Sequence, residues 1–182
     1  GDKLLGGGQA GLVMGRADLV EQLRGHPLRR ALRVDKTTLA ALDGTLSLYL
    51  EGAHLREVPT LAVLTRTEAD LERMAADLLA KLAGAAPAGW RGAVVAGLAQ
   101  VGGGCSADAS LPTRLVQWSG PREELESCHR RLRTGEPAVL ARIGQDGLAF
   151  DLRALREDEL PLLAAAVASA WAHPGTKPRE AP

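Results

Sequence analysis

The spacing of apolar residues changes near residue 91, and this change predicts the fold class. Before this point leucines recur at intervals of three and four, which is the spacing of one helix face, as in Leu39, Leu42, Leu46 and Leu50. After it, apolar residues gather in short runs that are typical of strands, at residues 94–101, 115–118, 138–143 and 148–152. The order predicts an α/β chain in two parts, the second built from antiparallel strands covered by helices.

Turn and cap residues sharpen this prediction in the second part. Thr67 with Asp70 three residues later resembles a capping box. It precedes an apolar face at helical spacing, made by Leu71, Met74, Leu78 and Leu82. Asp146-Gly147 lies between two apolar runs and predicts a hairpin. Helices are expected over 121–133 and 157–172, followed by a loose tail over 173–182.

The first part opens on a glycine-rich segment. We expect residues 1–15 to form a loop that leads into a short strand at residues 12–14, followed by a helix over 16–25 and a basic stretch. Residues 6–11 match the pattern G-x-G-x-x-G. A dinucleotide-binding fingerprint needs a strand before it and a helix after it, whereas an apolar, strand-like segment follows here. A dinucleotide-binding or non-catalytic domain is therefore an alternative that the pattern does not favour.

Charge and composition exclude some functions. Lys plus Arg and Asp plus Glu both number 22, so uniform basicity does not argue for nucleic-acid binding. Nucleic-acid binding would need a local patch or a basic domain outside this chain. Cys105 and Cys128 have no metal-ligand spacing, so we predict no metal site, and a reducing, cytoplasmic setting fits. No apolar run approaches the length of a membrane span.

Lys3 is the candidate reactive residue. A lysine forms a Schiff base when its amine is neutral and reaches a cofactor aldehyde. Lys3 lies in a polar loop just before glycines 6–8, and such small residues let the backbone pass close to a bulky ring and its phosphate. By chemistry alone this is a weak signal, because most lysines are solvated surface residues.

Several segments, in order, resemble one family. Gly1-Asp2-Lys3-Leu4-Leu5-Gly6-Gly7, followed by Gln9-Ala10-Gly11, resembles the lysine segment of the bacterial selenocysteine synthases, the L-seryl-tRNA(Sec) selenium transferases. The segment from His26 to Lys36 resembles the next family segment, and residues 101–104 with 111–113 resemble a loop of the small domain. The similarity runs from residue 1 to about residue 155. The chain departs from the family at Gly8, where proline is usual, and over 105–110.

The resemblance implies a fold-type I pyridoxal phosphate (PLP) enzyme. On that basis residues 1–55 are the C-terminal remnant of the PLP-binding large domain, residues 56–172 are the small C-terminal α/β domain, and residues 173–182 are a flexible tail. Lys3 is expected to hold PLP and then to act as the base at Cα of the seryl group. Arg30 and Arg33 are expected to bind selenophosphate, since guanidinium groups suit compact oxyanions.

The implied reaction converts seryl-tRNA(Sec) to selenocysteinyl-tRNA(Sec) by elimination of water and addition of selenium. The resemblance also implies that an N-terminal domain outside this chain grips the tRNA, and that the full-length protein forms a ring of dimers in the cytoplasm. We therefore expect the 182-residue piece alone to be inactive. A related fold-type I lyase, acting on a small amino acid or amino sugar, is the closest alternative. The sequence assigns no role to Asp2, Cys105 or Arg114.

Overall fold

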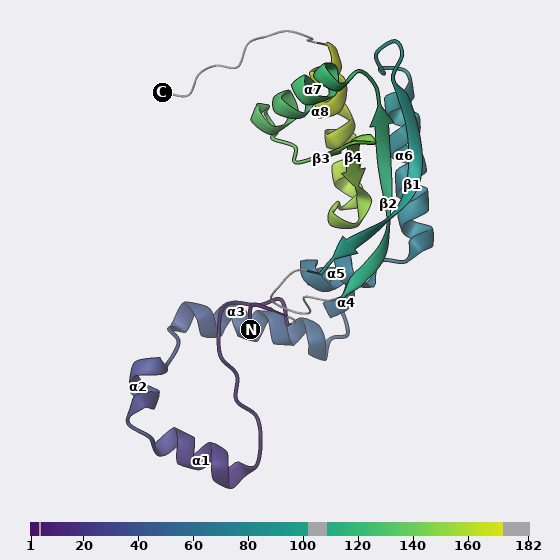
Figure 1. Cartoon of the computed structure of the whole chain (residues 1–182). Coiled ribbons are helices and arrows are strands. Elements are labelled where there is room, and N and C mark those ends of the chain that lie inside the picture. The colour runs from purple at the N-terminus through teal and green to yellow at the C-terminus, as the bar shows by residue number, and fades with distance from the viewer. Residues whose placement is uncertain (4, 102–108, 173–182) are drawn as a thin grey trace, which may run out of the picture. The chain divides into compact units, whose positions relative to one another are not determined.

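The computed structural model describes residues 1–3, 5–101 and 109–172, which fall into two compact units (Figure 1). The first unit is residues 1–65, and the second contains the described residues from Arg66 onward. The contacts divide the chain after Thr65, and the expected boundary between a large-domain remnant over 1–55 and a small domain over 56–172 stays a prediction. The predicted tail over 173–182 lies outside the described residues.

The first unit is helical. Its elements are α1 (Ala17–Gly25), α2 (Leu28–Leu32), α3 (Lys36–Leu50), α4 (His54–Glu57) and α5 (Pro59–Thr65). The helices expected over 16–25 and around Leu39 to Leu50 are thus confirmed as α1 and α3. Asp35 caps α3, because its carboxylate accepts a hydrogen bond from the Thr38 amide at 2.8 Å.

The strand predicted at residues 12–14 is wrong. These residues adopt neither helix nor strand, and Val13 and Met14 are 69% and 88% exposed. A strand needs a partner for its backbone hydrogen bonds, and no described residue of the first unit forms a strand. Apolar spacing alone does not report whether such a partner exists.

The second unit contains a four-stranded antiparallel sheet in the order β1-β2-β4-β3. The strands are β1 (Arg91–Gln100), β2 (Ser110–Ser119), β3 (Arg142–Gly144) and β4 (Gly147–Asp151). Val94 pairs with Val116, and Val116 with Phe150, so their side chains share one face. The predicted Asp-Gly hairpin is confirmed between β3 and β4, where Gly147 has a φ of 129°.

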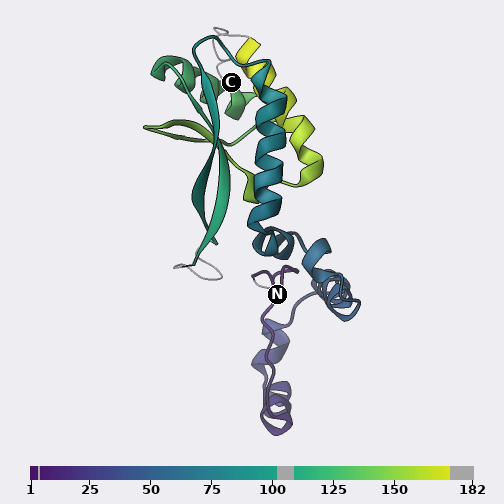
Figure 2. The ribbon, with the colours of Figure 1, turned by 90° about the vertical axis from the view of Figure 1, so that its right-hand side faces the viewer.

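Three helices cover this face of the sheet (Figure 2). They are α6 (Glu68–Ala83), α7 (Arg122–Thr134) and α8 (Leu160–Ala172), as the sequence predicts. Helix α6 packs on β1 and β2, α7 packs on β3 and β4, and α8 packs on both helices. The fully buried core includes Leu71, Leu78, Val116, Leu132 and Leu148. The helices therefore bury one face of the sheet in a continuous apolar core.

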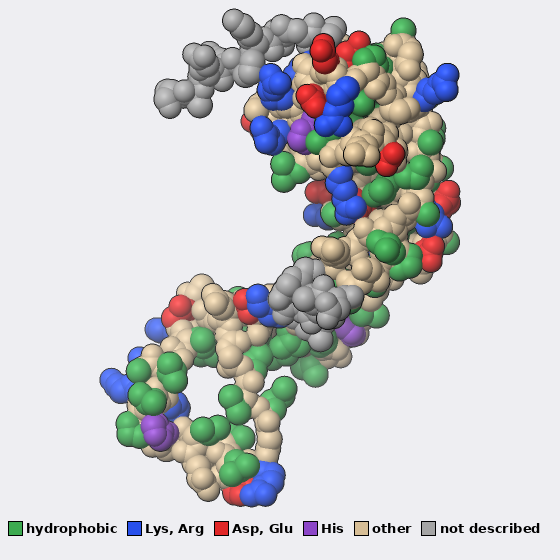
Figure 3. All heavy atoms as spheres, in the orientation of Figure 1, with side chains coloured by type: hydrophobic (Ala, Val, Ile, Leu, Met, Phe, Trp, Pro, Cys, Tyr) green, Lys and Arg blue, Asp and Glu red, His purple; other side chains and the backbone are tan. Residues whose placement is uncertain are grey.

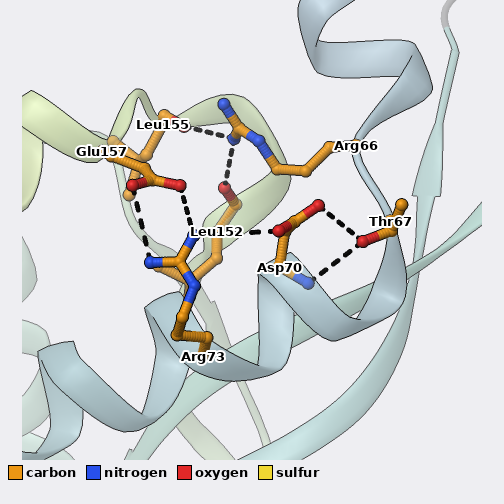
Figure 4. Close-up of polar contacts among 7 residues, drawn as sticks. All are labelled: Arg66, Thr67, Asp70, Arg73, Leu152, Leu155 and Glu157. Atoms are coloured by element: carbon orange, nitrogen blue, oxygen red, sulfur yellow. Dashed lines mark hydrogen bonds and ion pairs between the residues drawn. The ribbon is translucent and has the colours of Figure 1, made fainter.

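The start of α6 is tied to the segment after β4 (Figure 4). The Thr67 hydroxyl accepts a hydrogen bond from the Asp70 amide at 3.2 Å, which confirms the expected N-cap. The Arg66 guanidinium donates to the carbonyl oxygens of Leu152 and Arg153, each at 3.1 Å. Arg153 is 5% exposed and donates in return to the Arg66 carbonyl. Two arginines thus satisfy partly buried carbonyl groups with their guanidinium donors.

Cys128 lies in the core between α7 and α8, fully buried. Burial raises the pKa of its thiol, because the thiolate loses hydration. We expect the Cys105→Ser variant, which keeps Cys128, to react with a thiol reagent at least about 100-fold more slowly when native than in denaturant, since only the accessible thiolate is nucleophilic. Equal rates in the two conditions would contradict the burial.

Candidate active site

The glycine-rich segment lies against α3, and Lys3 is on its exposed side. The Gly6 amide donates to the Lys3 carbonyl oxygen at 3.1 Å, and the Gly7 amide donates to the Gly1 carbonyl oxygen at 2.9 Å. Across the same segment the Gly1 amine donates to the Ala10 carbonyl oxygen at 2.7 Å. These bonds fold the segment back on itself. Within the described part of the chain, the Lys3 side chain has no hydrogen-bond or ion-pair partner.

Two of the glycines are required by close packing within the unit. Gly6 has a φ of 72°, and a Cβ there would overlap the side chain of Val58. A Cβ on Gly7 would lie 3.0 Å from the Thr45 hydroxyl on α3. The sequence suggested that small residues make room for a ring and its phosphate. The structure adds another reason for Gly6 and Gly7, which is their close contact with the side chains of Val58 and Thr45.

Tyr49 makes the third contact with this segment. Its hydroxyl donates to the Leu5 carbonyl oxygen at 3.1 Å, and its ring stacks on His54 with centroids 4.5 Å apart. Neither residue belongs to a sequence motif that predicts a role in the site. Tyr49 lies 44 positions from Leu5, and nothing in the local pattern indicates that the two meet. The one feature of the sequence that marks Tyr49 is that the chain has a single tyrosine.

Arg30 and Arg33 lie on and just after α2, and both are exposed. Neither side chain has a hydrogen bond or ion pair to any residue that the structure describes. Their neighbour Arg29 differs, because it donates to the Arg24 carbonyl oxygen at 3.1 Å. Figure 1 shows α1 and α2 extending away from α3, and no hydrogen bond or ion pair between described residues joins Arg30 or Arg33 to Lys3. Their donors remain available to an anion.

The segment from residue 11 to residue 33 buries little of its apolar surface. Neither α1 nor α2 contains a buried residue. Figure 3 shows hydrophobic side chains at the surface of this part of the first unit. The exposed ones include Val13, Met14, Leu23, Leu28 and Leu32. This segment is therefore not held by a core of its own.

The residues without an assigned role fall into different environments. Arg114 on β2 pairs with Glu72, and with Glu68 at 3.1 Å, and the hydrogen bond that it donates to the Glu72 carboxylate raises the pKa of its guanidinium. Arg114 is thus engaged within the second unit rather than free to clamp a substrate. Asp2 is exposed, and Cys105 lies outside the described residues.

The described residues offer neither a metal site nor a membrane-spanning helix. Among the described ranges, no group of His, Cys, Asp and Glu side chains could hold a metal ion. No helix in those ranges has the length and apolar content needed to cross a bilayer.

Comparison with known proteins places these residues in a family. The family model described as L-seryl-tRNA selenium transferase matches residues 1–156. A protein of Geobacter metallireducens named L-seryl-tRNA(Sec) selenium transferase is 42% identical over 93% of this chain and 37% of its own length. Proteins of the same name from Aquifex aeolicus and Salmonella paratyphi B are 40% and 43% identical, over 88% and 87% of this chain and 35% of each relative.

The chain therefore belongs to the L-seryl-tRNA selenium transferase family, as the resemblance of its lysine and arginine segments indicated. It spans a little over a third of the length of the curated relatives that it matches.

Proposed function

We propose that this chain is the lysine-bearing part of a PLP-dependent L-seryl-tRNA(Sec) selenium transferase. The full-length protein would convert seryl-tRNA(Sec) to selenocysteinyl-tRNA(Sec), in the cytoplasm, with selenophosphate as the selenium donor. The observation that carries the proposal is Lys3, which is exposed on a segment packed against α3 and lies within the part that matches the family model. The alternative of a dinucleotide-binding domain has no support, since the glycines at 6–8 precede neither a helix nor a strand directly.

The described residues fit a PLP site in one respect. Lys3 has a side chain that is free to reach a cofactor, while its backbone is fixed through Gly6. When bound, PLP withdraws electrons from the bonds at the substrate Cα. The Lys3 amine would hold the cofactor, then accept the proton from Cα of the seryl group, and return a proton as the hydroxyl leaves as water. A base transfers a proton efficiently when it is held close to that proton. The fixed backbone at Lys3 would therefore help its amine to reach the Cα proton.

Arg30 and Arg33 are the proposed selenophosphate site. They present guanidinium groups three positions apart, without partners among the described residues. A compact polyanion is bound by such groups through charge-assisted hydrogen bonds. Both side chains are exposed, so little desolvation opposes the approach of the anion.

Replacing Arg30 or Arg33 by alanine in the full-length protein tests this assignment. Each loss should raise the KM for selenophosphate by about 10- to 100-fold, the range expected for hydrogen bonds to a charged group. The KM for seryl-tRNA(Sec) should stay unchanged. Arg29→Ala is the matched control, because Arg29 lies on the same helix but bonds to a backbone carbonyl. An equal rise in the KM for selenophosphate in all three variants would mean that the arginines act only through their general positive charge.

The proposed activity itself is tested with the full-length protein, PLP, selenophosphate and seryl-tRNA(Sec). Formation of selenocysteinyl-tRNA(Sec) supports the proposal. Failure to bind seryl-tRNA(Sec), with turnover of a small amino acid or amino sugar instead, would point to a related fold-type I lyase. We expect the tRNA to bind mainly through residues outside this chain and the assembly to be a ring of dimers, so residues 1–182 alone should show no turnover.

A further inference from the structure

Lys3 and Tyr49 are connected through a short path of backbone contacts. The Tyr49 hydroxyl donates to the Leu5 carbonyl oxygen, and the neighbouring Gly6 amide donates to the Lys3 carbonyl oxygen. Both distances are 3.1 Å. The side chain of one residue on α3 thus fixes the turn from which the lysine projects.

Three consecutive residues of this turn contact either α3 or Val58, which lies between α4 and α5. Leu5 meets Tyr49, Gly6 packs on Val58, and Gly7 packs on Thr45. The side chains of Val58 and Thr45 make van der Waals contacts with Gly6 and Gly7. Tyr49 contributes the directed contact, and removing its hydroxyl would leave a partly buried carbonyl without this donor.

The orientation of the Tyr49 ring is itself constrained. The ring lies nearly parallel to that of His54, with an interplanar angle of 13° and centroids 4.5 Å apart. His54 begins α4 and is half-buried, so the ring against which Tyr49 stacks belongs to a different helix. Stacking restricts rotation of the tyrosine ring and aims its hydroxyl at one carbonyl oxygen.

We propose that Tyr49 is a positioning residue for Lys3: it sets the reach of the lysine amine through the Leu5 carbonyl oxygen. The proposal rests on the proposed function of Lys3 and adds the residue that determines where the amine lies. Tyr49 touches neither substrate nor cofactor in this role. Its loss should therefore reduce the rate of the chemical step rather than the affinity for tRNA.

The test is Tyr49→Phe in the full-length protein, which keeps the ring and removes the hydroxyl. Amide hydrogen exchange over residues 2–10 should become about five-fold faster, as expected for one lost hydrogen bond. Release of PLP should accelerate by about the same factor, and kcat should fall about five-fold or more while the KM for seryl-tRNA(Sec) stays unchanged. Thr65→Val is the matched control, since it removes a hydroxyl that donates to the Leu61 carbonyl oxygen on α5.

The outcomes separate this proposal from the one on which it rests. If Lys3→Ala leaves the visible absorbance of lysine-bound PLP intact, the proposed function of Lys3 fails, whatever Tyr49→Phe does. If Lys3→Ala removes that absorbance but Tyr49→Phe leaves exchange over residues 2–10 and kcat at wild-type values, Tyr49 has no positioning role. An equal acceleration of amide hydrogen exchange over α5 in Tyr49→Phe would also overturn the proposal. It would mean that the Tyr49 hydroxyl stabilises the unit as a whole.

Discussion

Replacing Lys3 by alanine in the full-length protein should abolish covalent attachment of PLP and lower turnover by at least about 1,000-fold. The amine is proposed both to hold the cofactor and to move the Cα proton, and proton transfer by a positioned side chain alone contributes roughly 100- to 10,000-fold. Absorbance spectra with PLP added measure the attachment, and formation of selenocysteinyl-tRNA(Sec) measures the turnover. Stability should be unchanged, because Lys3 is exposed.

Lys36→Ala is the control for this prediction. Lys36 is an exposed lysine at the first position of α3, within the same unit. Its loss removes the same charge from the unit and should leave both the absorbance and the turnover near wild type. A visible PLP band that persists in Lys3→Ala and disappears in Lys36→Ala would move the reactive lysine to the start of α3.

The two units are stabilised differently, and this difference explains where substitutions should act. In the described part of the first unit, Leu42 and Val58 are the buried hydrophobic residues. The second unit encloses a continuous core that runs through α6, α7, α8 and the sheet. Substitutions at Lys3, Arg30 or Arg33 should therefore change function with little effect on stability. Substitutions in the sheet should change stability first.

The helices and the hairpin were predictable because their signals are local. The spacing from Leu71 to Leu82, the cap at Thr67 and the Asp146-Gly147 turn each act over a few residues, and each is confirmed. The apolar run at 138–143 was only partly a strand, since β3 begins at Arg142. The Val139 amide donates to the Leu132 carbonyl oxygen at 2.7 Å, so α7 satisfies a backbone group that a strand would have paired.

The candidate site was predictable to a different extent. Resemblance indicated Lys3, Arg30 and Arg33, because these residues lie in recognisable segments, and their roles stay predictions. It did not indicate Tyr49 or His54, whose contacts depend on how α3 and α4 fold back against the glycine-rich segment. Contacts between residues 44 positions apart are a property of the packing, which short sequence patterns do not encode.

Gly147→Ala should destabilise the second unit by about 3 kcal/mol. Gly147 has a φ of 129°. Residues with a Cβ rarely adopt this conformation, because it costs them about 1–3 kcal/mol. A Cβ at this position would also overlap the Trp118 carbonyl group on β2, so the hairpin of β3 and β4 would have to move away from β2. Trp118 lies in the core at 2% exposure, and that movement would disturb its packing.

Tryptophan fluorescence during urea denaturation measures this effect, because all three tryptophans belong to the second unit, where the ring of Trp171 contacts those of Trp90 and Trp118. Gly144→Ala is the matched control in the same hairpin. Gly144 lacks a positive φ, and a Cβ there would meet nothing within 4 Å. The control should change the unfolding midpoint little. A comparable loss in both variants would mean that glycine flexibility, rather than the close approach to Trp118, determines the effect at residue 147.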